Sequence, residues 1–232
     1  MDISTDLISQ CIGAAAALGT ASFALVDATK AFGGGVSNCG FGEIEKVVAS
    51  FFPPDEPRKI VNTQDVVPPL GLLQLLQTLR ANWLNGTALE GQKAIAKSLL
   101  KLRFNTVNIQ SYASATGMKV EVLMTLAEKI GRGASLTLPE SDAWARFDLL
   151  LTAILDQGYE RADQIYRNSA KAMSVVVSMV LAVFGFYIYE PTALSLGLGL
   201  IVGLAATPIA PIAKDLTSAI SAGVKVAETF RK

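Results

Sequence analysis

Few residues of this chain could carry out chemistry, and they do not have the spacing of an active site. The 232 residues include no histidine, which is the commonest general base and the commonest zinc ligand. The two cysteines, Cys11 and Cys39, lie in an apolar stretch and a glycine-rich loop, a separation that favours free thiols. The glycines at 33–35 lack the preceding strand and following lysine of a nucleotide-binding loop. We therefore expect a protein that is not an enzyme, with no catalytic residue, metal or cofactor.

Regular spacing is found instead among small residues within apolar stretches. Two sets recur at four-residue intervals: Ser195, Gly199, Gly203 and Thr207, and Gly13, Ala17 and Ala21. Four-residue spacing places each set on one face of a helix. In lipid, small side chains let two helix backbones approach closely, and the pair at 199 and 203 is a Gly-xxx-Gly motif. Both faces are predicted to pack against other helices, either within one chain or between chains.

These faces belong to long apolar segments. Residues 7–26, 172–189 and 192–213 contain no charged side chain. About 20 residues of helix are needed to cross the ~30 Å hydrocarbon core of a bilayer. The sequence therefore predicts three transmembrane helices, one near the N-terminus and two that form a C-terminal hairpin. Pro208 and Pro211 are expected to kink the third span near its end.

The basic residues are distributed unevenly around these three segments. All 20 lysines and arginines lie in residues 27–171 or from 214 onward. Because basic loops stay on the cytoplasmic side, both regions are expected to be cytoplasmic, with the N-terminus and the turn at 190–191 outside. The candidate membrane-surface residues are Lys93, Lys97, Lys101, Arg167, Lys171 and Lys214. The first three recur every four residues, and a solvated helix face is the alternative interpretation of that stripe.

The region between the first two spans is predicted to be a small helical domain. Apolar spacing and turn residues predict helices over 43–52, 70–85, 87–104 and 118–130. A Thr-x-x-Glu capping box at 87–90 is expected to start the third of these. Residues 105–117 are polar and are expected to be irregular. The aromatic pair Phe51 and Phe52 is expected either to dip into the membrane interface or to pack against the domain.

A single long helix is predicted from residue 138 to residue 189. A second capping box begins at Thr137, and no proline follows Pro139 until Pro191, so the helix would be about 78 Å long. Its cytoplasmic half has apolar or small residues at coiled-coil-like spacing: Trp144, Phe147, Leu151, Ile154, Gly158, Ala162, Ile165 and Ser169. The alternative is that this row packs within the helical domain of the same chain.

The expected fold is all-α, and its parts follow one another along the chain. They are an N-terminal transmembrane helix (1–32), a cytoplasmic helical domain (33–137), a long helix that continues into the second span (138–190), a third span (191–213) and an amphipathic cytoplasmic tail (214–232). With a formal net charge of zero, bulk charge gives no reason to expect nucleic-acid binding.

The function expected from these features is that of an integral membrane scaffold or anchor. The expected partners are the lipid bilayer, further copies of the chain, and a cytoplasmic or membrane protein. A homo-oligomeric pore or ion channel gated from the cytoplasm is the first alternative, because the same small faces could pack spans around a conduction path. An accessory subunit of a larger membrane complex is the second.

Overall fold

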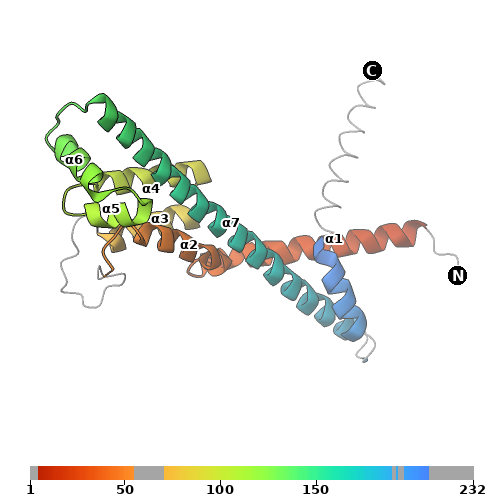
Figure 1. Ribbon diagram of the computed structural model, residues 1–232. Helices are drawn as coiled ribbons and strands as arrows, with labels where there is room; N and C mark the ends of the chain where they lie inside the picture. Colours follow the sequence, from red (N-terminus) through yellow and green to blue (C-terminus); the bar gives the residue numbers. More distant parts are fainter. Residues whose placement is uncertain (1–4, 55–70, 190–191, 193–195, 209–232) are drawn as a thin grey trace, which may run out of the picture. The chain divides into compact units, whose positions relative to one another are not determined.

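The computed structural model describes residues 5–54, 71–189, 192 and 196–208, and all regular secondary structure in these residues is helical (Figure 1). The elements are α1 (Thr5–Ala28), η1 (Thr29–Ala31), η2 (Gly35–Ser37), α2 (Asn38–Ala49), α3 (Leu72–Leu84), α4 (Leu89–Leu102), α5 (Ile109–Thr116), α6 (Val120–Gly131), α7 (Leu138–Tyr189) and the helix Leu196–Pro208. They form two compact units. We call residues 37–166 the helical domain, and residues 1–36 with 167–232 the apolar unit.

The first half of α7 is part of the core of the helical domain. Its buried residues follow one face at intervals of three and four: Phe147, Leu151, Leu155, Tyr159 and Ala162. They pack in one cluster with buried side chains of α2 to α6, among them Ile44, Leu79, Leu100, Tyr112 and Leu126. The predicted apolar row of α7 thus packs within its own chain, whereas Ile165 at the end of that row is exposed.

Two glycines allow α2 and α7 to approach closely inside this domain. A Cβ atom at Gly158 would lie 2.7 Å from Cγ2 of Val47, and one at Gly40 would overlap the carbonyl oxygen of Ala162. The chain leaving α2 turns its aromatic pair inward, so that Phe51 and Phe52 are both buried in the core. Of the two expectations for this pair, packing against the domain is confirmed and insertion into the membrane interface is wrong.

Residues 105–117 were expected to be irregular, but they contain the short helix α5. The side-chain oxygen of Asn105 accepts hydrogen bonds from the backbone N–H groups of Val107 and Asn108, which forms a turn just before the helix. The buried Tyr112 then holds α5 in place, since its hydroxyl donates a 2.6 Å hydrogen bond to the carbonyl oxygen of Leu100. Gly117 ends the helix at φ +69°. Tertiary packing therefore stabilises a helix in a segment whose composition favours a loop.

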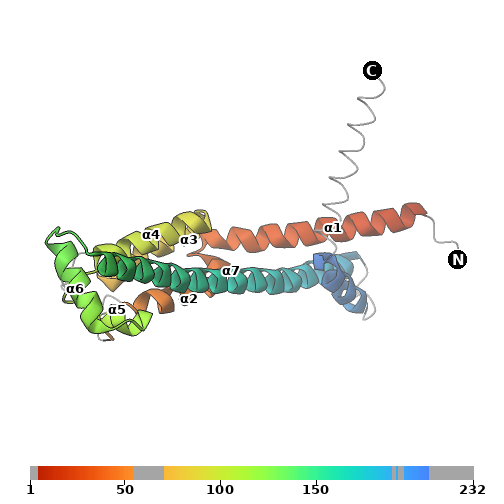
Figure 2. The ribbon, with the colours of Figure 1, turned by 45° about the horizontal axis from the view of Figure 1, so that its top comes forward.

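The two predicted capping boxes have different outcomes. Thr87 does not cap α4: the N-cap residue is Ala88, and the Thr87 hydroxyl bonds instead to the side-chain oxygen of Asn82 at 3.3 Å. At the start of α7, Glu140 reaches back and accepts a 2.8 Å hydrogen bond from the backbone N–H of Thr137, as a capping box requires. From there α7 is continuous over 52 residues (Figure 2).

Two helices among the described residues are long and apolar enough to cross a membrane. One covers Ile12–Ala31, with mean hydropathy 1.4, and the other is α7, with mean hydropathy 2.1 over its most apolar window. Only 17% of each apolar window is buried, whereas the core helix of a soluble domain is mostly buried. The third predicted span appears as the shorter apolar helix Leu196–Pro208. Residues 209–213 of that span and the predicted tail at 214–232 lie outside the described residues.

Candidate functional site

The predicted Gly-xxx-Gly pair makes a close helix contact in the apolar unit. A Cβ atom at Gly199 would lie 2.7 Å from the Cα atom of Val183. One at Gly203 would overlap the Cα atom of Met179 and lie 2.8 Å from the carbonyl oxygen of Ser178. Both glycines therefore lie against the backbone of α7 in the same chain, in an intrachain hairpin.

Hydroxyl groups accompany this contact. The Ser178 hydroxyl donates a 2.8 Å hydrogen bond to the carbonyl oxygen of Gly203 on the opposite helix. Ser174, one turn away and fully buried, bonds within α7 to the carbonyl oxygen of Ala170. Thr207, one turn beyond Gly203, is buried, and its hydroxyl has no hydrogen-bond partner among the described residues. Ser195, the first member of the predicted face, lies outside the described residues.

The second small-residue face, on α1, makes no close contact with the other residues that the structure describes. Gly13, Ala17 and Ala21 are all exposed, and a Cβ atom at Gly13 would meet nothing within 4 Å. The buried residues in this part of α1 are Gly19, Ser22 and Val26, which lie on a different face. Within the described residues, the structure therefore brings the C-terminal small face into contact with α7 and leaves the N-terminal one exposed.

The lysine stripe of α4 faces α7 rather than an open surface. Lys97 and Lys101 both pair with the carboxylate of Asp148, the former at 2.6 Å. Burial raises the pKa of Asp148, but the hydrogen bonds and charges of Lys101 and Lys97 outweigh this effect and hold that pKa below its ordinary value. Lys101 also lies 5.4 Å from the ring centre of Trp144.

Lys93, at the other end of the lysine stripe of α4, also pairs with acidic residues. Its ammonium group lies 2.5 Å from a carboxylate oxygen of Glu90, 3.0 Å from Asp156 and 4.0 Å from Glu160. Hydrogen bonds to Glu90 and Asp156 raise the pKa of Lys93 above its ordinary value. The sequence predicted that this stripe faces either the membrane surface or solvent. The acidic residues along α7 are the feature of the sequence that could have indicated ion pairs instead.

The remaining predicted membrane-surface and helix-kink residues do not lie near the lysine stripe in the sequence, and some lie outside the described residues. Arg167 and Lys171 are exposed on α7, where its polar half meets its apolar half. Pro208 is the last described residue of the helix Leu196–Pro208, so the predicted kink is not tested. Lys214 and Pro211 lie outside the described residues.

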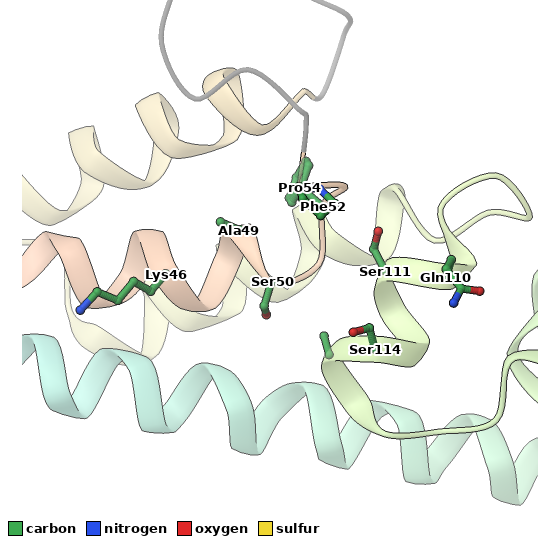
Figure 3. Close-up of a pocket in the computed structure, with 9 residues that line it drawn as sticks. Lys46, Ala49, Ser50, Phe52, Pro54, Gln110, Ser111 and Ser114 are labelled. Carbon is green, nitrogen blue, oxygen red and sulfur yellow. The ribbon is translucent and has the colours of Figure 1, made fainter.

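A groove of about 570 Å³ with a mixed polar and apolar lining lies in the helical domain between the C-terminal end of α2 and α5 (Figure 3). Its lining comprises Lys46, Ala49, Ser50, Phe52, Pro54, Gln110, Ser111, Ser114 and Ala115. Ser50 lies on the α2 side, and Ser111 and Ser114 lie on the α5 side (Figure 3). Lys46 extends along α2 to a carboxylate oxygen of Glu43, 2.5 Å away.

This groove offers hydroxyl, amide and ammonium groups for hydrogen bonding. None of its serines has a carboxylate beside it in the lining that could act as a general base. It therefore suits the binding of a polar segment better than a reaction. Sequence reasoning missed it because half of it is built by α5, which was expected to be irregular.

In the part of the chain that the structure describes, no group of three acidic or cysteine residues could hold a metal ion. Comparison with known protein families, characterised proteins and solved structures finds no match to this chain.

Proposed function

We propose that this protein is a membrane-anchored assembly protein that presents its helical domain to partners in the cytoplasm. The observation that carries the proposal is the composition of α7. Its first half supplies the central core residues of the helical domain, and its second half is an apolar segment of span length. One unbroken helix thus belongs both to a folded domain and to a hydrophobic anchor.

The apolar unit supports the anchoring role. Large apolar side chains stay exposed along α7, among them Val176, Val180 and Phe184. Their exposure would be costly in water but favourable in lipid. Three hydroxyl groups of the same unit are turned inward: Ser22, Ser174 and Ser178 are buried and hydrogen-bonded. Exposed apolar side chains together with inward, hydrogen-bonded hydroxyl groups are typical of helices surrounded by lipid.

Two surfaces support assembly. The α1 face of Gly13, Ala17 and Ala21 is open and small, which suits close packing with a helix of another copy. The groove between α2 and α5 provides hydrogen-bonding groups for a cytoplasmic partner. We propose the orientation from the distribution of basic residues, with the N-terminus and the 190–191 turn outside.

The mass of the detergent-extracted particle tests the assembly role. One chain has a mass of 24.5 kDa, and we expect the protein, after subtraction of bound detergent, to be a multiple of it. Gly13→Leu should lower that multiple, because a large side chain would separate the packed faces. Gly185→Leu is the matched control, since Gly185 also has open space around it but lies on α7.

A strictly monomeric parent protein would overturn the assembly role. A protein that stays in solution without detergent would overturn the anchor as well. Reporter fusions at Gly86 and Lys232 are expected on the cytoplasmic side, and a fusion at Glu190 on the outside. Planar-bilayer recordings from the purified oligomer are expected to show no current. Selective single-channel currents would reject the scaffold function in favour of a pore.

A further inference from the structure

An exposed aromatic residue lies where the first apolar helix ends. Phe32 is 83% exposed and directly follows the candidate span Ile12–Ala31. It is preceded by Lys30, which pairs with Asp27. The aromatic pair that the sequence suggested for membrane contact, Phe51 and Phe52, is buried in the helical domain and is not available for this role.

The turn that carries Phe32 is ordered by Thr29. The N–H of Phe32 donates a 2.9 Å hydrogen bond to the carbonyl oxygen of Thr29, and the N–H of Val36 donates one to the Thr29 hydroxyl at 3.4 Å. That hydroxyl in turn donates to the carbonyl oxygen of Val26 at 2.6 Å. The chain therefore closes on the end of α1 while Phe32 stays outside the closed turn.

Three glycines make this turn possible. Gly33, Gly34 and Gly35 have φ angles of +70°, +100° and +46°, a region that other residues rarely adopt. A Cβ atom at Gly35 would also overlap the Thr29 hydroxyl and carbonyl groups. In the sequence these glycines were notable only for lacking the signatures of a nucleotide-binding loop, whereas the structure shows a specific turn that holds one aromatic side chain outward.

We propose that Phe32 inserts into the headgroup region of the lipid bilayer and fixes the depth at which the chain leaves the membrane. This inference rests on the proposed membrane anchor. A phenylalanine ring is apolar, so the boundary between headgroups and acyl chains solvates it better than water does, and a lysine near a helix end can extend its ammonium group toward the headgroups. Lipid is the partner because the ring directly follows a helix of span length and composition.

Nitroxide spin labels in phosphatidylcholine vesicles test this depth. In a Cys11→Ser, Cys39→Ser background, single cysteines replace Phe32, Val180 and Val107. Val180, 61% exposed in the apolar half of α7, reports the hydrocarbon core, and Val107, 87% exposed in the helical domain, reports water. The measured quantity is the ratio of collisions with oxygen to collisions with a water-soluble nickel complex, which rises with depth in the bilayer.

We expect the ratio at position 32 to be several-fold above that at position 107 and below that at position 180. A ratio at position 32 equal to that at 107, or as high as that at 180, overturns the interfacial position while leaving the membrane anchor intact. Low collision with both reagents would mean that protein covers the residue, and also overturns it. If position 180 itself reports water, the proposed anchor fails.

The role of the turn is tested in the same labelled protein. Gly35→Ala should increase the mobility of the label at position 32, because the new methyl group cannot fit against Thr29. Gly42→Ala is the matched control, since a Cβ atom there meets nothing within 4 Å. Equal label mobility in the two variants would show that the closed turn does not position Phe32.

Discussion

The hydroxyl group of Ser178 donates a 2.8 Å hydrogen bond to the carbonyl oxygen of Gly203, where the two helices of the hairpin are in close contact. The bond depends on the glycine because a side chain at position 203 would overlap the backbone of α7. The lack of that side chain lets the Ser178 hydroxyl come near enough to donate. Close packing and interhelical hydrogen bonding are therefore coupled in this hairpin, as expected where the hydrophobic effect does not drive association between helices.

Gly203→Leu should separate the hairpin. The new side chain would overlap the backbone at Met179 and Ser178, which cannot move aside as a flexible side chain could. We expect the detergent-solubilised particle of this variant to be lost at a lower thermal midpoint than that of the parent protein. For Gly199→Leu we expect the midpoint to decrease by less. Gly197→Leu serves as the control because a Cβ atom there meets nothing within 4 Å. Equal midpoints for Gly203→Leu and Gly197→Leu would contradict the close contact.

Ser178→Ala should cost more stability than Ser174→Ala. Both serines are buried, but only the Ser178 bond joins two helices, whereas the Ser174 hydroxyl bonds within its own helix. Interhelical hydrogen bonds in membranes contribute about 0.6 kcal/mol on average and at most ~1.7 kcal/mol. A difference of this size should appear in unfolding of the hairpin by a denaturing detergent. Equal losses for the two variants would mean that the interhelical bond contributes nothing.

Sequence reasoning predicted which glycines pack, but not the hydrogen bond from the Ser178 hydroxyl to the carbonyl oxygen of Gly203. Four-residue spacing is visible in the sequence, so the face of Gly199 and Gly203 could be identified without a structure. Whether that face meets the same chain or another depends on the turn and on the register of the hairpin, which spacing does not encode. For the same reason the pattern could not distinguish it from the face at Gly13, which is exposed among the described residues.

Leu151→Ala should strongly destabilise the helical domain. Leu151 is fully buried in the core cluster, and removal of a buried leucine side chain costs about 2–5 kcal/mol. Leu149→Ala, at a position 69% exposed two residues earlier, should change stability by no more than about 0.5 kcal/mol. Both tryptophans of the chain, Trp83 and Trp144, lie in this domain, so their fluorescence during urea unfolding reports it specifically.

The same comparison addresses the coiled-coil interpretation of α7. If an intermolecular seam determined the role of Leu151, its loss would lower the particle mass and leave the unfolding of the domain unchanged. The seam and the core share apolar spacing at three and four residues, which is why the sequence left both open. The structure decides for the core, because α2 packs against α7 at Gly158 and Gly40. The importance of these two glycines could not be recognised from the spacing of apolar residues in the sequence.

Asp148→Asn should weaken the contact between α4 and α7. The carboxylate accepts from both Lys97 and Lys101 and is partly screened from solvent, so we expect a loss of about 1 kcal/mol at low salt. Because salt screens such pairs, the difference from the parent should shrink at 1 M salt. Glu121→Gln, an exposed carboxylate on α6, is the control. A loss that does not change with salt would point to packing rather than to charge.

The lysine stripe shows where charge patterns in a sequence are ambiguous. Lys93, Lys97 and Lys101 share a helix face, and a basic face of this kind suits lipid headgroups, water or an acidic helix equally well. The choice depends on which side of α4 packs inward, and the buried Ala96 and Leu100 turn that side toward the core. The acidic residues of α7 then lie within reach.

Acidification should destabilise the start of α7 through Glu140. Hydrogen bonds from Lys129 and from Thr137 lower the pKa of Glu140 from 4.5 to about 2. Because the folded protein holds the carboxylate ionised, its contribution to stability is complete above pH 4.5 and is lost as the pH falls toward 2. Glu140→Gln should therefore lower stability at neutral pH and flatten the loss of stability across this window.

Tryptophan-monitored urea unfolding at several pH values measures both effects, with Asp142→Asn as the control in the same helical turn. Parallel pH profiles for the parent and the Glu140→Gln variant would contradict the cap.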